Sequence, residues 1–163
     1  MEASSRTNKK IIILDRPNPN SFYVDGPVLE KENSSFIGLH PVPIVYGMTI
    51  GEYGKMINEE GWLGEKMKAD LEVIKIENYT HNMRYEPPVR PSPNLPNLQS
   101  IYLYPSLAFL EKTEVSVGRG TKIQFQIYGH PDFKSGFSFT PLPNFGSQFP
   151  KLNGKLSFGE DLR

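Results

Sequence analysis

The sequence predicts an α/β fold, and three features of its 163 residues predict it. A continuous apolar run near the start is followed, after a long loop and a helical pattern, by a second apolar strand. A proline-rich stretch then interrupts the regular pattern. Beyond it lie another helical pattern and segments that alternate between apolar and polar residues, so each half of the chain combines helix and strand.

The first strand is predicted at residues 11–14, in the stretch KKIIILDRPNPN. The apolar run ends at Asp15, and two prolines follow within four residues. A continuous apolar run bounded by turn residues is typical of a strand buried on both faces, as in a parallel sheet. The stretch ADLEVIKIENY predicts a second strand, with Leu71 and Val73 among its apolar members.

A helix is predicted between these strands, in the stretch MTIGEYGKMINEEGWLG. Thr49 is a favourable N-cap residue, and Glu52 follows three residues later, which is the spacing of a capping box. Gly61 or Gly64 would end the helix. The order strand, long loop, helix, strand is that of a βαβ unit with a right-handed crossover.

A domain boundary is predicted at residues 85–97, because the stretch YEPPVRPSPNLP holds five prolines. Closely spaced prolines favour extended geometry and exclude both a helix and a central strand. The sequence therefore predicts a first domain over residues 1–84, a proline-rich connector over 85–97 and a second, smaller α/β domain over 98–163.

In the second domain the apolar spacing from Leu98 to Leu110 predicts a helix, in which Pro105 either opens a second helix or kinks a single one. The stretch EVSVGRGTKIQFQIYGHP alternates, and predicts half-buried strands on either side of Gly118 and Gly120. The tail after residue 136, rich in Phe, Pro and Gly, predicts irregular connections with short strands.

The first domain is predicted to be only the closing part of a parallel-sheet domain. Two strands and one helix cannot cover both faces and both edges of a buried parallel sheet. We therefore expect the chain to be a fragment of a larger two-domain protein, with an N-terminal segment missing.

Composition argues against several function classes. Lys plus Arg and Asp plus Glu both number 18, so the formal net charge is zero and nucleic acid is a poor partner. No apolar run reaches the roughly 20 residues that span a bilayer, and the first ten residues lack the apolar core of a signal peptide. The chain has no cysteine, and His40, His81 and His130 lie far apart in predicted turns or surface positions, so no metal site is predicted.

Several stretches together resemble one family. They are LDRPNP, VDGPVL, FIGLHPVPIVYGMTIGE, PSPNLPNLQSIYLYPSLAFLE, VSVGRGT and FQIYGHP, and they run in order from about residue 10 to the end of the chain. They are similar to the exo-β-N-acetylmuramidase (NamZ-like) glycoside hydrolases, which remove terminal N-acetylmuramic acid from peptidoglycan fragments. The resemblance implies that the first domain is the closing part of a Rossmann-like domain, and that the partners are peptidoglycan fragments or muramyl sugars.

The resemblance also implies an incomplete catalytic centre. Family members carry a Glu-His-Gly motif, the usual candidate for the catalytic acid, and this sequence holds none. Tyr46 stands where the family has His before Gly-Met-Thr; a tyrosine can hydrogen-bond a sugar but is not an acid near neutral pH. We expect weak or no turnover by this chain alone, no cofactor, and a periplasmic or secreted location.

The candidate catalytic residues are Asp15 and Glu52, because glycoside hydrolysis generally uses two carboxyl groups. Asp15 closes a predicted parallel strand, and ligands of open α/β sheets bind beyond the carboxyl ends of the strands. It is equally compatible with an Asx-type turn or a salt bridge to Arg16. Glu52 is already explained by the capping box, which weakens its case as a catalytic group.

The candidate substrate-binding residues begin with Arg119, which lies between two glycines in VSVGRGT. A guanidinium could bind the lactyl carboxylate of muramic acid, although the same pattern also suits a plain turn. Arg16 and Asn18 follow the first strand and could serve the same cleft, facing one shared pocket with Asp15 and Arg119. The remaining candidates are Tyr46, and Ser92 and Asn94 in the proline-rich segment. The alternative interpretation of that segment is a stiff connector between the domains.

A rival hypothesis is a non-catalytic protein-interaction module. PPVRP and PNLP both have the P-x-x-P spacing that aromatic-lined grooves bind, and Arg90 could supply the flanking charge.

Trp62, the only tryptophan, is predicted to pack against the fold rather than to form a sugar platform.

Overall fold

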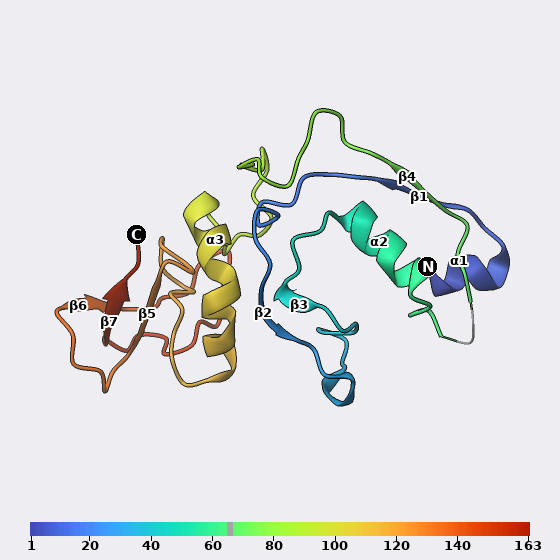
Figure 1. Cartoon of the computed structure of the whole chain (residues 1–163). Helices are drawn as coiled ribbons and strands as arrows, with labels where there is room; N and C mark the ends of the chain where they lie inside the picture. Colours follow the sequence, from blue (N-terminus) through green and yellow to red (C-terminus); the bar gives the residue numbers. More distant parts are fainter. Residues whose placement is uncertain (65–66) are drawn as a thin grey trace. The chain divides into compact units, whose positions relative to one another are not determined.

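The structure is a computed structural model that describes residues 1–64 and 67–163. It divides into two compact units, Met1–Tyr85 and Glu86–Arg163 (Figure 1). Helices and strands occur in both units, and the first unit holds a parallel strand pair. The predicted mixed α/β class is therefore confirmed.

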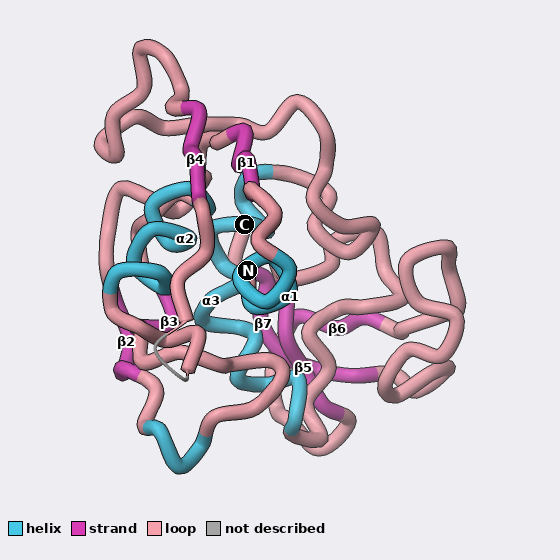
Figure 2. The backbone as a smooth tube through the Cα atoms, turned by 90° about the vertical axis from the view of Figure 1, so that its right-hand side faces the viewer, coloured by secondary structure: helices cyan, strands magenta, loops and turns pink. Residues whose placement is uncertain are grey.

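The first unit contains the predicted strand–helix–strand segment. Strand β1 (Ile11–Leu14) pairs in parallel with β4 (Leu71–Ile74), with Ile11 opposite Leu71 (Figure 2). Helix α2 (Ile50–Glu59) lies between them in the chain. It packs closely on the sheet at Gly54, where a Cβ atom would lie 2.9 Å from Ile13 Cδ1. A short helix, α1 (Glu2–Thr7), precedes β1 and was not predicted from the sequence.

The prediction that β1 is buried on both faces is wrong for the residues that the structure describes. Ile12 and Leu14 are 57% and 75% exposed, whereas Ile11 and Ile13 are partly buried. The alternation arises because α2 packs against the face that holds Ile13 and Val73. Ile74 of β4 is exposed on the same side as Leu14, its partner in the register.

The segment predicted as a long loop contains a second, antiparallel pair. Strand β2 (Asp25–Val28) pairs with β3 (Pro43–Val45), and a short 3-10 helix, η1 (Lys31–Asn33), lies between them. The ladder is irregular between Asp25 and Val28, where Pro27 has no N–H to donate. Because of this irregularity, the strand pair lacks the alternation of apolar and polar residues from which strands are predicted.

The second unit combines one helix with a three-stranded sheet. Helix α3 (Leu98–Leu107) runs through Pro105 and continues into a 3-10 helix, η2 (Ala108–Lys112). Strands β5 (Ile127–His130), β6 (Phe137–Phe139) and β7 (Ser157–Asp161) form an antiparallel sheet in the order β5-β7-β6. Leu107, Val117 and Phe125 form its buried core.

The two strands predicted around the glycine pair are only partly present. Ser116 forms an isolated bridge with Gly129, and the regular ladder starts at Ile127. A half-buried strand would alternate between buried and exposed residues, whereas residues 124–127 are all buried. Phe125 also has a φ of 54°, which is incompatible with an extended strand.

The glycine pair itself forms a tight turn. Gly118 and Gly120 have φ values of 78° and 84°. The Thr121 N–H and its hydroxyl both donate to the Gly118 carbonyl. A Cβ atom at Gly120 would lie 2.7 Å from the Leu142 carbonyl oxygen, so backbone conformation and packing both call for glycine there.

Candidate functional site

Asp15 lies at the carboxyl end of β1 and is bound to the start of α2. Its Oδ2 accepts a 2.7 Å hydrogen bond from the Thr49 hydroxyl, and its Oδ1 accepts one of 2.8 Å from the Gly51 N–H. The carboxylate thereby pairs one of the N–H groups that the first turn of a helix leaves without a partner in the helix. The Asp15 Oδ1 also accepts a 3.0 Å hydrogen bond from the Arg16 N–H, so the carboxylate has a partner in its own loop as well.

Glu52 occupies the predicted capping box and contacts a histidine as well. Thr49 and Glu52 exchange side-chain and backbone hydrogen bonds as the sequence predicts. The Glu52 carboxylate also lies 2.9 Å from His81 Nε2. The sequence predicts His81 as a turn or surface residue, and no spacing pattern links it to Glu52, which lies 29 residues away in the chain.

A small hollow of about 150 Å³ lies beside these groups, at the carboxyl ends of β1 and β4. Asp15, Glu52 and Thr49 line it together with Lys55, Lys75 and Tyr79. Open α/β sheets bind ligands at this end of the strands. Both predicted catalytic carboxylates therefore face one charged hollow in the first unit.

Two predicted binding residues near this hollow have partners of their own. The Asn18 Nδ2 donates to the Met48 carbonyl at 2.8 Å, which holds the loop after β1 against the segment before α2. Arg16 is exposed, and its backbone contributes the hydrogen bond to Asp15. Their roles in substrate binding stay predictions.

Tyr46 lines a different hollow of the first unit, of about 950 Å³. Its ring stacks on Tyr53 with centroids 5.1 Å apart, and the Tyr53 hydroxyl lies 2.8 Å from His40 Nδ1. His40 in turn stacks on Trp62, so the predicted packing role of Trp62 agrees with this contact. Burial lowers the pKa of His40 and raises the pKa of Tyr53.

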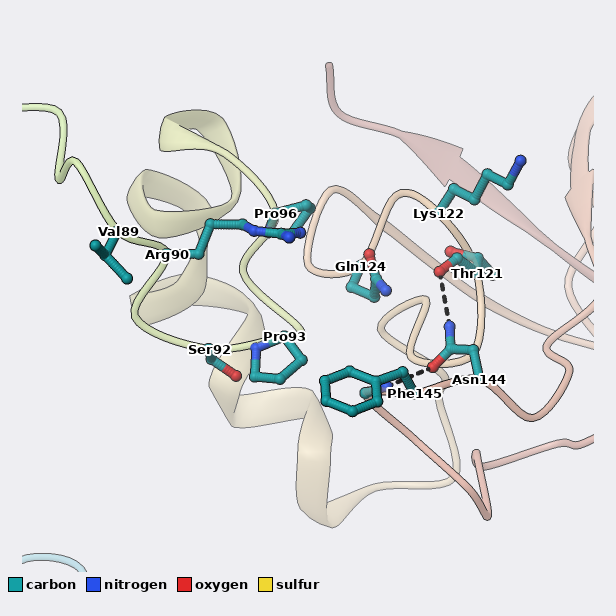
Figure 3. A pocket seen from close by; sticks show the side chains of 11 residues that line it. Val89, Arg90, Ser92, Pro93, Pro96, Thr121, Lys122, Gln124, Asn144 and Phe145 are labelled. Carbon is teal, nitrogen blue, oxygen red and sulfur yellow. Dashed lines mark hydrogen bonds between the residues drawn. The ribbon is translucent and has the colours of Figure 1, made fainter.

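The second unit holds a hollow of about 630 Å³, which we call the second-unit hollow (Figure 3). Three segments form it: the proline-rich segment, the turn after Gly120 and the turn at Asn144. Its lining residues are Val89, Arg90, Ser92, Pro93, Pro96, Thr121, Lys122, Gln124, Asn144, Phe145 and Gly146. Asn144 joins two of these segments, because its Nδ2 donates to the Thr121 carbonyl at 3.1 Å.

The proline-rich segment is packed into the second unit by Asn94. This residue is only 5% exposed, and its Nδ2 donates to the Gly146 carbonyl at 2.7 Å. The Ser92 hydroxyl accepts from the Asn94 N–H, and Ser92 itself lines the second-unit hollow. Leu95 packs against the core of the unit. Of the two predicted rim residues, Ser92 thus lines the hollow and Asn94 is buried and does not.

Arg119 is engaged within the second unit. Its guanidinium lies 2.6 Å from Glu111 Oε1 and 5.0 Å from the centre of the Phe125 ring. It is not among the residues that line the second-unit hollow. Asp15 belongs to the first unit and Arg119 to the second, and the prediction that they face one shared pocket stays a prediction.

Within residues 1–64 and 67–163, no three His, Asp or Glu side chains are grouped closely enough to hold a metal ion. No helix in the same ranges is long and apolar enough to cross a membrane.

Comparisons with known proteins agree over the whole chain. Residues 1–99 match the family model described as exo-β-N-acetylmuramidase NamZ, N-terminal, and residues 102–163 match its C-terminal counterpart. The peptidoglycan β-N-acetylmuramidase NamZ of Bacillus subtilis (strain 168) is 40% identical over 180 aligned residues, which cover 99% of this chain and 42% of the Bacillus protein.

Two crystal structures of DUF1343 family proteins from Bacteroides fragilis NCTC 9343 are also similar. One has a TM-score of 0.97 at 48% identity, and the other has a TM-score of 0.87 at 25% identity. Each comparison covers 99% of this chain and 46% of the Bacteroides chain. The chain therefore spans less than half the length of these relatives.

Proposed function

The chain belongs to the exo-β-N-acetylmuramidase NamZ family, and we propose that it serves the release of terminal N-acetylmuramic acid from peptidoglycan fragments. We propose that this chain carries mainly the part that recognises the substrate. The 40% identity to a peptidoglycan β-N-acetylmuramidase supports the substrate class. Peptidoglycan lies outside the cytoplasmic membrane, so a periplasmic or secreted location is part of the proposal.

The second-unit hollow is the observation that carries this proposal. Ser92, Thr121 and the amides Gln124 and Asn144 line it beside Phe145, which is 94% exposed. Sugar sites combine a few polar groups, which fix orientation, with an apolar or aromatic surface that contacts the ring carbons. Two of the stretches that resemble the family, PSPNLP and VSVGRGT, lie at or beside this hollow.

For the chemical step, the proposal keeps Asp15 and Glu52 as the candidate carboxyl groups of this chain. Both line the small hollow at the strand ends, and glycoside hydrolysis generally uses one carboxyl group as proton donor and a second as base, nucleophile or charge stabiliser. Both already accept hydrogen bonds from the start of α2. Because both carboxylates already have hydrogen-bond partners, we propose that this chain contributes more to substrate recognition than to catalysis.

The test combines a binding assay and a turnover assay on the same protein. We expect saturable binding of a disaccharide that ends in N-acetylmuramic acid, followed by isothermal titration calorimetry, and weak or no release of nitrophenol from a nitrophenyl β-muramide. Folding is checked by near-UV circular dichroism. If the folded protein does not bind the disaccharide, the proposed role in substrate recognition is wrong. Rapid turnover contradicts the division of roles, because the catalytic groups would then lie within these 163 residues.

The rival hypothesis of a Pro-rich interaction module has less support. Its PNLP motif is tied into the second unit, where Asn94 and Leu95 are packed and Pro93 and Pro96 line the hollow. A groove that binds P-x-x-P needs the proline face of the ligand to be free. Only the preceding PPVRP stretch stays largely exposed.

A further inference from the structure

The second-unit hollow is positively charged, although the chain as a whole is neutral. Arg90 and Lys122 line it, and no Asp or Glu does. Within residues 1–64 and 67–163, no carboxylate lies within 4.0 Å of either cation. In Figure 3 the Lys122 side chain extends away from the other lining side chains, whereas Arg90 extends toward Pro96.

Arg119 differs from Arg90 in this respect. Glu111 lies 2.6 Å from its guanidinium and neutralises it. A ligand carboxylate at Arg119 would have to displace Glu111. The new ion pair would only replace the one that is lost. At Arg90 an incoming carboxylate meets an uncompensated charge.

Gln124 supplies a second observation that points to a ligand. This side chain is only 7% exposed and lines the hollow, yet its Oε1 has no hydrogen-bond partner in the part of the chain that the structure describes. An unpaired buried acceptor is costly in free energy, and a donor that enters the hollow would remove the cost. The neighbouring Gln126 shows the paired case, since its Oε1 accepts from Asn97 Nδ2 at 3.0 Å.

We propose that the second-unit hollow selects a pyranose that carries a carboxylate, with Arg90 as the counter-ion and Gln124 Oε1 as the acceptor for a hydroxyl or acetamido N–H. The proposal rests on the proposed function and deepens it, because it assigns the charge preference to residues of this chain. A guanidinium forms two parallel hydrogen bonds with a carboxylate, so it recognises shape as well as charge. Recognition by Arg90 then separates N-acetylmuramic acid from N-acetylglucosamine, which lacks the lactyl group.

The experiment compares three sugars by isothermal titration calorimetry with the full chain. They are N-acetylmuramic acid, its methyl ester, which keeps the size but loses the charge, and N-acetylglucosamine. We expect the acid to bind about tenfold or more tightly than the other two, which corresponds to one charge-assisted hydrogen-bond pair. The preference should shrink at high salt, because the hollow is open to solvent.

Five variants, Arg119→Ala among them, assign the preference to residues. Arg90→Ala should bind the acid and the ester equally, and Arg90→Lys should restore part of the difference. Lys112→Ala removes an exposed positive charge elsewhere in the same unit and should leave the preference unchanged. Gln124→Met keeps the side-chain length without the acceptor and should weaken all three sugars by a similar factor, with folding checked by thermal denaturation.

The outcomes separate the two proposals. If none of the sugars binds to folded protein, the proposed function fails. If the acid binds and Arg90→Ala keeps the full preference over the ester, or the wild-type protein shows no such preference, the charge selection by Arg90 is wrong while sugar binding stands. Loss of the preference in Arg119→Ala, with Arg90→Ala unaffected, would return the role to Arg119.

Discussion

At the scale of single residues, environment decides the role of each charged group. Arg119 and Arg90 are the same amino acid in neighbouring segments of one unit, but Glu111 pairs only with Arg119. Arg119 is the candidate in the sequence because two glycines flank it. Those glycines are explained by the positive φ values of the turn, so they carry no information about a ligand.

His40 and Trp62 give a residue-level prediction about pH. Burial lowers the pKa of His40 from its ordinary 6.5, so the folded protein favours neutral imidazole. The unfolded chain then binds the proton more readily, and His40 contributes stability that is present above pH 6.5 and is lost as the pH falls toward its lower folded pKa.

Trp62 fluorescence measures this titration, because His40 stacks on the indole with centroids 5.2 Å apart. Protonated imidazole quenches indole emission more strongly than neutral imidazole does. We expect the emission to fall with a midpoint below pH 6.5, and His40→Gln to abolish the transition. His81→Gln removes a histidine elsewhere in the same unit and should leave the transition in place. A midpoint above 6.5 would contradict the effect of burial.

At the scale of elements, the helix starts follow from local sequence. The capping box of α2 was predicted from Thr49 and Glu52 and is confirmed. Helix α3 begins with a similar arrangement of Asn97 and Ser100, which the sequence analysis did not identify. Both interactions join residues three apart, which is why a linear reading can find them.

Asp15 gives the prediction at this scale, since it connects β1 to α2. Asp15→Ala removes the acceptor of the Thr49 hydroxyl and of the Gly51 N–H, and should lower the free energy of unfolding by about 1–3 kcal/mol. Urea denaturation measures the change. Asp15→Asn, which keeps one oxygen acceptor, should cost less.

Glu59→Ala is the matched control for Asp15, because Glu59 is an exposed acid near the other end of α2. Its effect should stay within about 0.5 kcal/mol. If Asp15→Ala is as stable as the wild type, then the contacts of Asp15 with α2 do not hold the helix to the sheet. Its case as a catalytic group would then gain support.

At the scale of the whole molecule, the two units differ in the size of their sheets and in their buried cores. The second unit has its own buried core and a three-stranded sheet. The first unit has two-stranded sheets. Large apolar side chains are exposed in both units, among them Ile12, Leu14 and Phe36 in the first and Phe145 and Phe149 in the second. Isolated two-stranded sheets are marginally stable, and large exposed apolar patches promote association.

We therefore expect residues 86–163 to fold when they are produced alone. Their unfolding should be cooperative, and their affinity for N-acetylmuramic acid should lie within about threefold of the full chain, because every lining residue of the second-unit hollow belongs to this unit. Residues 1–85 serve as the comparison and should bind a hydrophobic dye. A folded 86–163 fragment without affinity, beside a full chain that binds, would show that the first unit contributes to the site.

Local sequence patterns predict the mixed α/β class, the parallel pair of β1 and β4, the capped start of α2 and the family. These depend on apolar runs, on i to i+3 spacing and on ordered motifs, all of which are properties of short stretches of chain. The folded structure is needed to show that Glu111 neutralises Arg119, that Gln124 Oε1 is buried with no hydrogen-bond partner among the described residues, and that no described carboxylate lies within 4.0 Å of Arg90 or Lys122. Such facts depend on contacts that form only when the chain folds, between residues that no helix or strand periodicity links.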